Sequence, residues 1–139
     1  MDTNGHTILF EDYVSFEIAQ LLKEKGFDEI CSYEWGPTVN EGYVLQKWII
    51  TNGQIKNSDL IDGAYTAPSQ SIALKWLREV HKLHIYAVPY WPQGDMRNKM
   101  SWQGLIVDLN TINGDSQCYA DSFEEAIENR LKFALENLI

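Results

Sequence analysis

Residues 65–90 read YTAPSQSIALKWLREVHKLHIYAVPY, and this stretch decides the fold because a helix pattern passes directly into a strand pattern. Thr66 and Pro68 form a helix start, since threonine caps first turns and proline lacks only an N–H that has no intrahelical partner. The stretch HIYAVPYW (84–91) predicts a strand in which Pro89 requires an edge position, a bulge or the strand end. At about 100° per residue, one arc predicts the buried face: Ile72, Ala73, Trp76, Leu77, Val80 and Leu83.

A first helix is predicted within VSFEIAQLLKEKGFD (14–28). Ser15 is placed to cap it, and Gly26 is placed to end it in the left-handed conformation that glycine adopts readily. Phe16 falls on the side opposite the apolar face, so we expect it to contact a loop or a partner. The apolar face consists of Val14, Ile18, Leu21 and Leu22.

The last helix is predicted within DSFEEAIENRLKFALENLI (121–139). Ser122 and Glu125 have the spacing of a capping box, which marks a helix start. The apolar face consists of Phe123, Ile127, Leu131, Ala134, Leu135 and Leu138.

Two pairs of strand patterns lie between these helices. CSYEW (31–35) and YVLQKWII (43–50) are separated by glycine, proline and asparagine, which predicts a hairpin. The strand at 84–91 forms a second hairpin with SWQGLIVDLN (101–110), where Gly104 indicates a bulge or a close backbone approach.

The predicted order is therefore α-β-β-α-β-β-α. Because strands pair most often with their sequence neighbours, we expect a mainly antiparallel sheet of about four strands, two hairpins in all, covered by the three helices. The sequence thus predicts an α+β fold with residues 1–139 as a single domain.

Charge and composition limit the function. The 139 residues contain 11 Lys and Arg against 20 Asp and Glu, a formal charge of −9, so we expect no nucleic acid as a general partner. No apolar run approaches the ~20 residues of a membrane span, and MDTNGHTILFEDYVSF (1–16) lacks a basic leader, so we expect a cytoplasmic protein with no membrane association. Cys31 and Cys118 lack metal or redox spacing and are expected to be reduced.

Three blocks of the chain resemble one group of proteins: SFEIAQLLKEKGF (15–27), APSQSIALKWLREVHKLHI (67–85) and FEEAIENRLKFALENLI (123–139). They are similar to small uncharacterised proteins of Bacteroidetes genomes and of their phages or mobile elements. The resemblance spans most of the chain and implies a bacterial or phage origin. That group has no established activity to transfer to any residue.

Two histidines are the first candidates for chemistry. His81 and His84 are three residues apart, but no cysteine pair or HExxH pattern supplies further zinc ligands, so we predict no metal and no cofactor. His81 is better explained as a partner of the helix C-terminal dipole. GxSxG and phosphate-binding glycine loops are absent, which favours a protein without enzymatic activity. The alternative is a small enzyme that uses His81 or His84 with a carboxylate, the candidates being Glu34, Glu79 and Asp108.

Aromatic and basic side chains are the second group of candidates. Tyr90 and Trp91 are the aromatic pair most expected to be exposed, because PYWP interrupts the strand. Lys75, Arg78 and Lys82 lie opposite the apolar arc and predict a basic stripe. The leading hypothesis is a binding or accessory protein that acts on a protein partner through these five residues.

A further alternative is an acidic phage inhibitor that mimics nucleic acid with the carboxylates of its first and last helices. Glu128, Lys132 and Glu136 are spaced at i,i+4, which is typical of an ordinary solvated face instead.

Overall fold

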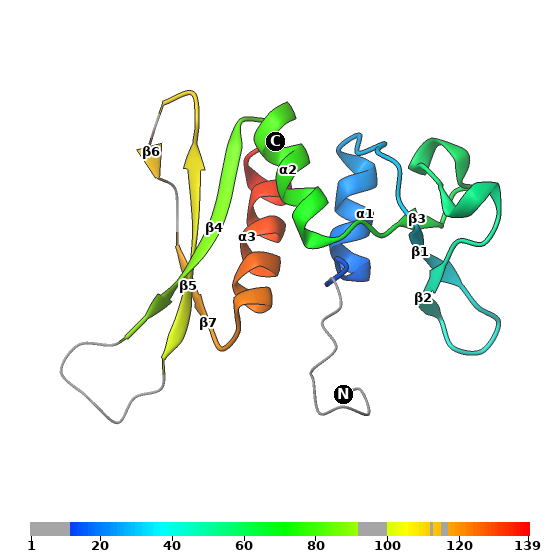
Figure 1. Ribbon diagram of the computed structural model, residues 1–139, viewed down its shortest axis with the longest axis horizontal. Helices are drawn as coiled ribbons and strands as arrows, with labels where there is room; N and C mark the ends of the chain where they lie inside the picture. The colour runs from blue at the N-terminus through cyan, green and yellow to red at the C-terminus, as the bar shows by residue number, and fades with distance from the viewer. Residues whose placement is uncertain (1–11, 92–99, 112, 115–116) are drawn as a thin grey trace.

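The computed structural model describes residues 12–91, 100–111, 113–114 and 117–139, and it confirms the α+β class (Figure 1). The helices are α1 (Phe16–Glu24), α2 (Gln70–Val80) and α3 (Phe123–Asn137). The strands are β1 (Tyr33–Pro37), β2 (Tyr43–Lys47), β3 (Tyr65–Thr66), β4 (Leu83–Tyr90), β5 (Ser101–Asp108), β6 (Asn113–Gly114) and β7 (Cys118–Ala120). Two short 3-10 helices span Thr51–Gly53 and Asn57–Asp59.

The predicted hairpins form two sheets, so the expectation of one four-stranded sheet is wrong. The first sheet has the order β2-β1-β3, and the second has the order β4-β5-β6 with β7 also paired to β5. The first sheet is completed by β3, a short strand after the long loop, which pairs with β1 through Glu34 opposite Thr66 and Trp35 opposite Tyr65. The second hairpin lies on the other side of the helices (Figure 1), where it forms its own sheet with β6 and β7.

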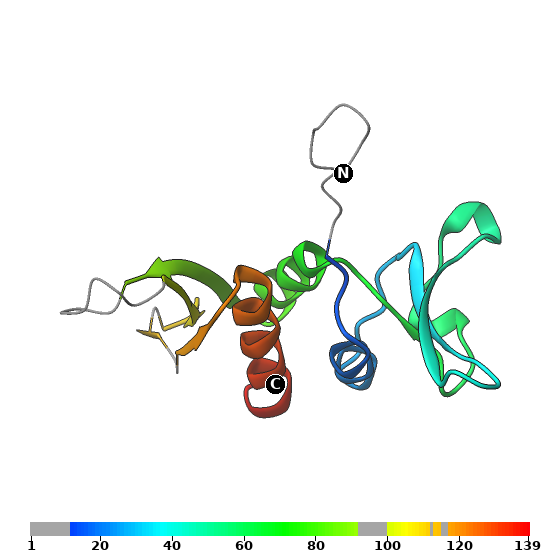
Figure 2. The ribbon, with the colours of Figure 1, turned by 90° about the horizontal axis from the view of Figure 1, so that it is seen from below.

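The helices lie between the two sheets (Figures 1 and 2). α3 packs on β4, β5 and β7, α2 packs on β4, and α1 contacts both α3 and β3. The largest fully buried side chains come from the three helices, from β3 and β5, and from Val14 and Phe27, which flank α1. Most of them belong to one continuous core around the helices.

Helix starts follow local chemistry. The hydroxyls of Ser15 and Ser122 accept hydrogen bonds from the backbone N–H groups three residues ahead, which confirms both predicted caps. α2 starts later than predicted, because Ser69 caps it and Thr66 belongs to β3. Pro68 consequently precedes the helix.

The buried face of α2 is narrower than the predicted arc. Ala73, Trp76 and Leu77 are buried, whereas Ile72 and Val80 are exposed. Among the helices and strands, α2 packs mainly on α3 and β4, and a helix packed mainly from one side buries chiefly the residues that point there.

Phe16 links α1 to the first sheet. Its ring stacks on Tyr43 with centroids 4.2 Å apart and meets Trp35 and Tyr65 edge-on at 6.2 and 5.7 Å. The residue that fell outside the predicted helix face therefore has a partner in the sheet.

Two strand features agree with prediction. Pro89 lies in β4, an edge strand of the second sheet. A Cβ on Gly104 would lie only 2.8 Å from Cγ of Arg130 and 3.0 Å from the carbonyl oxygen of Ala126, so β5 approaches α3 closely at this glycine.

Candidate functional site

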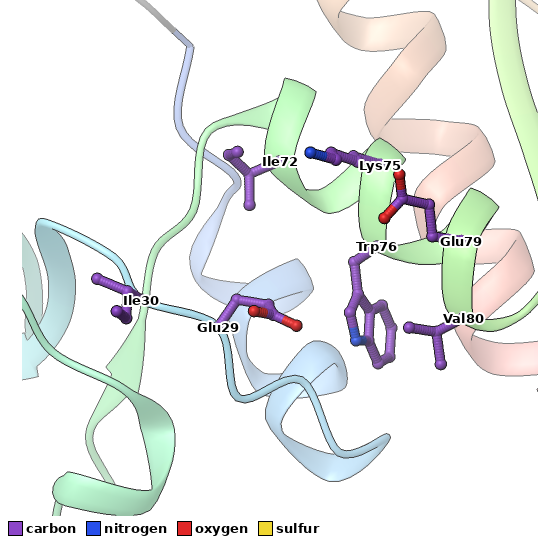
Figure 3. Close-up of a pocket in the computed structure, with 7 residues that line it drawn as sticks. All are labelled: Glu29, Ile30, Ile72, Lys75, Trp76, Glu79 and Val80. Carbon is purple, nitrogen blue, oxygen red and sulfur yellow. The ribbon is translucent and has the colours of Figure 1, made fainter.

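A groove lies between α2 and the segment that leads from α1 to β1. We call it the α2 groove; it encloses about 300 Å³. Figure 3 shows its lining: Glu29, Ile30, Ile72, Lys75, Trp76, Glu79 and Val80.

The end of α1 positions one wall of the α2 groove. Gly26 adopts φ 93°, and the N–H of Phe27 donates to the carbonyl of Leu22, so the chain reverses and buries Phe27. The Phe27 ring meets Trp76 edge-on at 5.4 Å between centroids. This contact holds Glu29 and the residue after it opposite α2.

Helical spacing positions the other wall. Ile72, Trp76 and Val80 follow one another at intervals of four residues and therefore share one face of α2. Lys75 and Glu79 form a neighbouring row with the same spacing.

Trp76 forms the floor of the α2 groove. Its indole meets the ring of Phe27 edge-on at 5.4 Å and the ring of His81 at 4.8 Å, and only 7% of the residue is exposed. A largely buried ring with two aromatic contacts is a rigid surface against which another side chain can lie.

Aliphatic side chains surround this floor and remain open to solvent. Ile30 is 54% exposed, Ile72 41% and Val80 56%. They come from two segments more than forty residues apart in sequence. The fold thus gathers three exposed aliphatic groups around one indole.

Charged side chains complete the lining. Lys75 and Glu79 reach it from α2, and Glu29 reaches it from the opposite wall (Figure 3). The α2 groove is therefore apolar at its floor and carries both signs of charge around it.

The predicted basic stripe does not lie on one helical face. Lys75 lines the α2 groove and Arg78 is half-buried. Lys82 lies beyond the helix with φ 58°, and its Nζ donates to the carbonyl of Glu79 at 3.0 Å. The prediction failed because α2 ends at Val80, so helical spacing does not extend to Lys82.

The two histidines pack on different aromatic rings. His81 is the C-cap of α2 and contacts Trp76, whereas His84 lies in β4 and stacks on Tyr86 at 5.5 Å. Within the described ranges, no group of three or more His, Cys, Asp or Glu side chains could hold a metal ion.

The candidate carboxylates lie on three different elements. Glu34 is buried in β1 and accepts a hydrogen bond from the Gln46 amide at 2.9 Å. Asp108 ends β5 and accepts from the N–H of Asn110, while Glu79 lines the α2 groove.

The predicted aromatic pair lies at the end of β4, on the second sheet. Trp91 is 66% exposed, as expected, and Tyr90 is half-buried against Tyr119 with ring centroids 4.8 Å apart. Trp35, Trp48 and Trp102 are half-buried, so Trp91 is the exposed member of the five tryptophans.

Both cysteines are free thiols. Cys31 is buried beside the first sheet, and this burial raises the pKa of its thiol to about 11. The Cys31 thiol is therefore a poor nucleophile near neutral pH. Cys118 is half-buried on β7.

Several groove residues were missed from the sequence. Glu29 and Ile30 follow a helix end and belong to no periodic pattern, and Ile72 and Val80 were assigned to the core. The available signal was the spacing of Ile72, Trp76 and Val80, which defines one face but not what covers it.

None of the described helices is long and apolar enough to cross a membrane. Comparison of the chain with protein-family models, curated proteins and solved structures found no match.

Proposed function

We propose that this protein is a protein-binding domain and that the α2 groove receives apolar side chains of a partner protein. The observation that carries the proposal is the set of three exposed aliphatic side chains, Ile30, Ile72 and Val80, around the indole of Trp76. Interface hot spots have this composition: an aromatic anchor in a packed setting, with apolar neighbours that exclude water.

Covering the aliphatic side chains of the α2 groove would supply part of the free energy of binding. Burying an aliphatic side chain completely is worth about 1.5–3 kcal/mol. The three aliphatic residues are about half exposed, so covering them would contribute roughly 2–4 kcal/mol in total. Losing this contribution would weaken binding by at least about 10-fold.

The charged lining would orient the partner. Glu29, Lys75 and Glu79 stand beside the apolar floor, where charges act chiefly on association rate and on the choice of partner. A partner with one acidic and one basic side chain beside its apolar anchor would complement both signs.

The alternatives have less support. The histidines contact aromatic rings, and no observed contact joins either of them to a carboxylate in the described part of the chain. Acids expected to form a mimic of nucleic acid instead join α1 to α3. Glu128 accepts from the N–H and hydroxyl of Ser15, and Glu17 pairs with Lys132 at 3.0 Å.

The test is affinity capture with two matched double variants. Ile72→Glu with Val80→Lys removes the aliphatic groups of α2, keeps the net charge and places each charge at the helix end that favours it. Ile61→Glu with Trp91→Lys is the control, since both side chains are exposed and lie outside the α2 groove.

The expected result is a protein from the source organism that the wild-type chain and the control retain and the groove variant loses. A protein retained equally by all three chains would contradict the proposal. Loss with the control alone would assign binding to Ile61 or Trp91 instead, and failure of the wild-type chain to retain any protein would also count against it.

A further inference from the structure

β2 is the outer strand of the first sheet, and its outer edge is open. Among the strands of the described residues it pairs with β1 alone, and four of its five residues are exposed. The other long edge strand, β4, differs because Leu83 and Ile85 are buried there. The open edge of β2 is called the β2 edge below.

The hydrogen-bond alternation shows which backbone groups point outward. The N–H of Trp48 donates to the carbonyl of Ser32 at 2.8 Å, and the N–H of Thr38 donates to the carbonyl of Gly42 at 2.6 Å. Both bonds join even-numbered residues, and bonded pairs alternate with non-bonded pairs along antiparallel strands. The backbone N–H and C=O groups of the even-numbered residues of β2 therefore point toward β1.

Three residues therefore direct their N–H and C=O groups away from the sheet: Tyr43, Leu45 and Lys47. In the described part of the chain, no hydrogen bond joins their backbone groups to another residue. Six backbone donors and acceptors thus face outward along this strand.

Aliphatic side chains flank the β2 edge. Val39 precedes the strand, and Ile49 and Ile50 follow it, all three exposed. Leu45, at the middle of the strand, is also exposed. An open strand with aliphatic flanks is the kind of edge that proteins usually block with charge, proline or a covering element.

We propose that the β2 edge binds an extended segment of a partner protein, which adds to the first sheet as a further antiparallel strand. The outward groups of neighbouring odd-numbered residues are about 6.8 Å apart, a repeat that another extended backbone matches. This inference is independent of the α2 groove.

The side chains and charge of the chain restrict the segment. A residue directly opposite Leu45 lies on the same sheet face, so an aliphatic residue at that position would cover its exposed part. The formal charge of −9 repels a second copy and favours a segment that is neutral or basic. The expected segment therefore has aliphatic residues at alternate positions and no net negative charge.

The probe is a library of displayed random 12-residue peptides, selected on the full chain. Peptides with the pattern above are expected, and their dissociation constants are then measured on two variants. Leu45→Pro removes an outward N–H without removing a β1–β2 hydrogen bond, and should weaken binding at least ~10-fold. Leu45→Ala keeps that N–H and should weaken binding only ~2- to 5-fold.

Amide hydrogen exchange on the wild-type chain gives a readout that does not depend on the folding of Leu45→Pro. The N–H groups of Tyr43, Leu45 and Lys47 should exchange fast in the free chain and slowly with the peptide bound. Those of Val44 and Gln46 should be protected in both states, because they point toward β1.

Other outcomes would overturn the proposal. The proposal fails if the selection yields no peptide, or if the selected peptides leave hydrogen exchange at the three outward amides unchanged. It also fails if a folded Leu45→Pro variant binds the peptides as tightly as the wild-type chain does. Self-association of the free chain that Leu45→Pro abolishes would assign the β2 edge to a second copy. The groove variant of the preceding section should still bind the peptide, so the two proposals can fail separately.

Discussion

The Phe16 ring stacks on the Tyr43 ring with centroids 4.2 Å apart, and this contact joins α1 to the outer strand of the first sheet. Trp35 and Tyr65 extend the same aromatic cluster, and the indole N–H of Trp35 donates to the carbonyl of Val14 at 3.0 Å. The first sheet is therefore held against the helices largely by aromatic side chains.

Phe16→Ala should lower the free energy of unfolding by about 2–3 kcal/mol. The variant loses apolar burial and three ring contacts, but the position is only half-buried. Urea denaturation measures the change. Phe16→Leu, which keeps most of the apolar volume, should lose about half as much. A loss below ~0.5 kcal/mol for Phe16→Ala would mean that the cluster does not hold the first sheet.

Lys82→Gly should stabilise the chain relative to Lys82→Ala by about 1 kcal/mol. Lys82 has φ 58° directly after the C-cap of α2, a position that glycine most often occupies. Both variants lose the hydrogen bond to the carbonyl of Glu79, so their difference reports the backbone strain minus the extra entropy that glycine loses on folding. Thermal melting compares them, and equal melting temperatures would rule out a strain larger than that entropy loss.

Gly104→Ala should destabilise the chain by about 1–3 kcal/mol. The new methyl group would lie 2.8 Å from Cγ of Arg130, 2.9 Å from Sγ of Cys118 and 3.0 Å from the Ala126 carbonyl oxygen. Adding Cys118→Ala should restore part of the loss, because it removes the sulfur but not the other two neighbours. Chemical denaturation of both single variants and the double variant gives the coupling free energy between the two positions. Changes in unfolding free energy that simply add in the double variant would contradict this packing.

Cys31 should make the free energy of unfolding decrease as pH rises from about 8.5 to about 11. Burial raises the pKa of the folded thiol, so over this range the unfolded state has lost a proton that the folded state retains. The contribution of the protonated Cys31 thiol to stability is complete below the pKa of the thiol in the unfolded state, and it is lost as the pH rises through the pKa in the folded state. Denaturation at several pH values should show a shallower decrease for Cys31→Ala, and identical slopes would contradict the assignment.

Local features of the fold could be predicted because neighbouring residues decide them. Ser15 and Ser122 cap helices through bonds to N–H groups three residues ahead, and Gly26 ends α1 with a positive φ. The close approach at Gly104 was also signalled by a glycine within a strand pattern. In each case a side chain, or its absence, acts on the adjacent backbone.

The candidate site could be predicted only in part. Lys75 was chosen for its charge and does line the α2 groove. Ile72 and Val80 were assigned to the core because periodicity identifies residues that share a face but carries no information on whether that face is covered. Ile30 lies outside any pattern and reaches the α2 groove only through the reversal after α1.

By itself, then, the sequence determined the α+β class, the three helices, two of their three caps and the two main hairpins. The tertiary structure decided that the hairpins separate into two sheets, that Phe16 meets Tyr43, and that Ile72 and Val80 stay exposed. Helix starts and turns depend on hydrogen bonds and φ preferences within a few residues, which the local sequence encodes. Strand partners and covered faces depend on which distant segments come together in the fold, as when β3 pairs with β1.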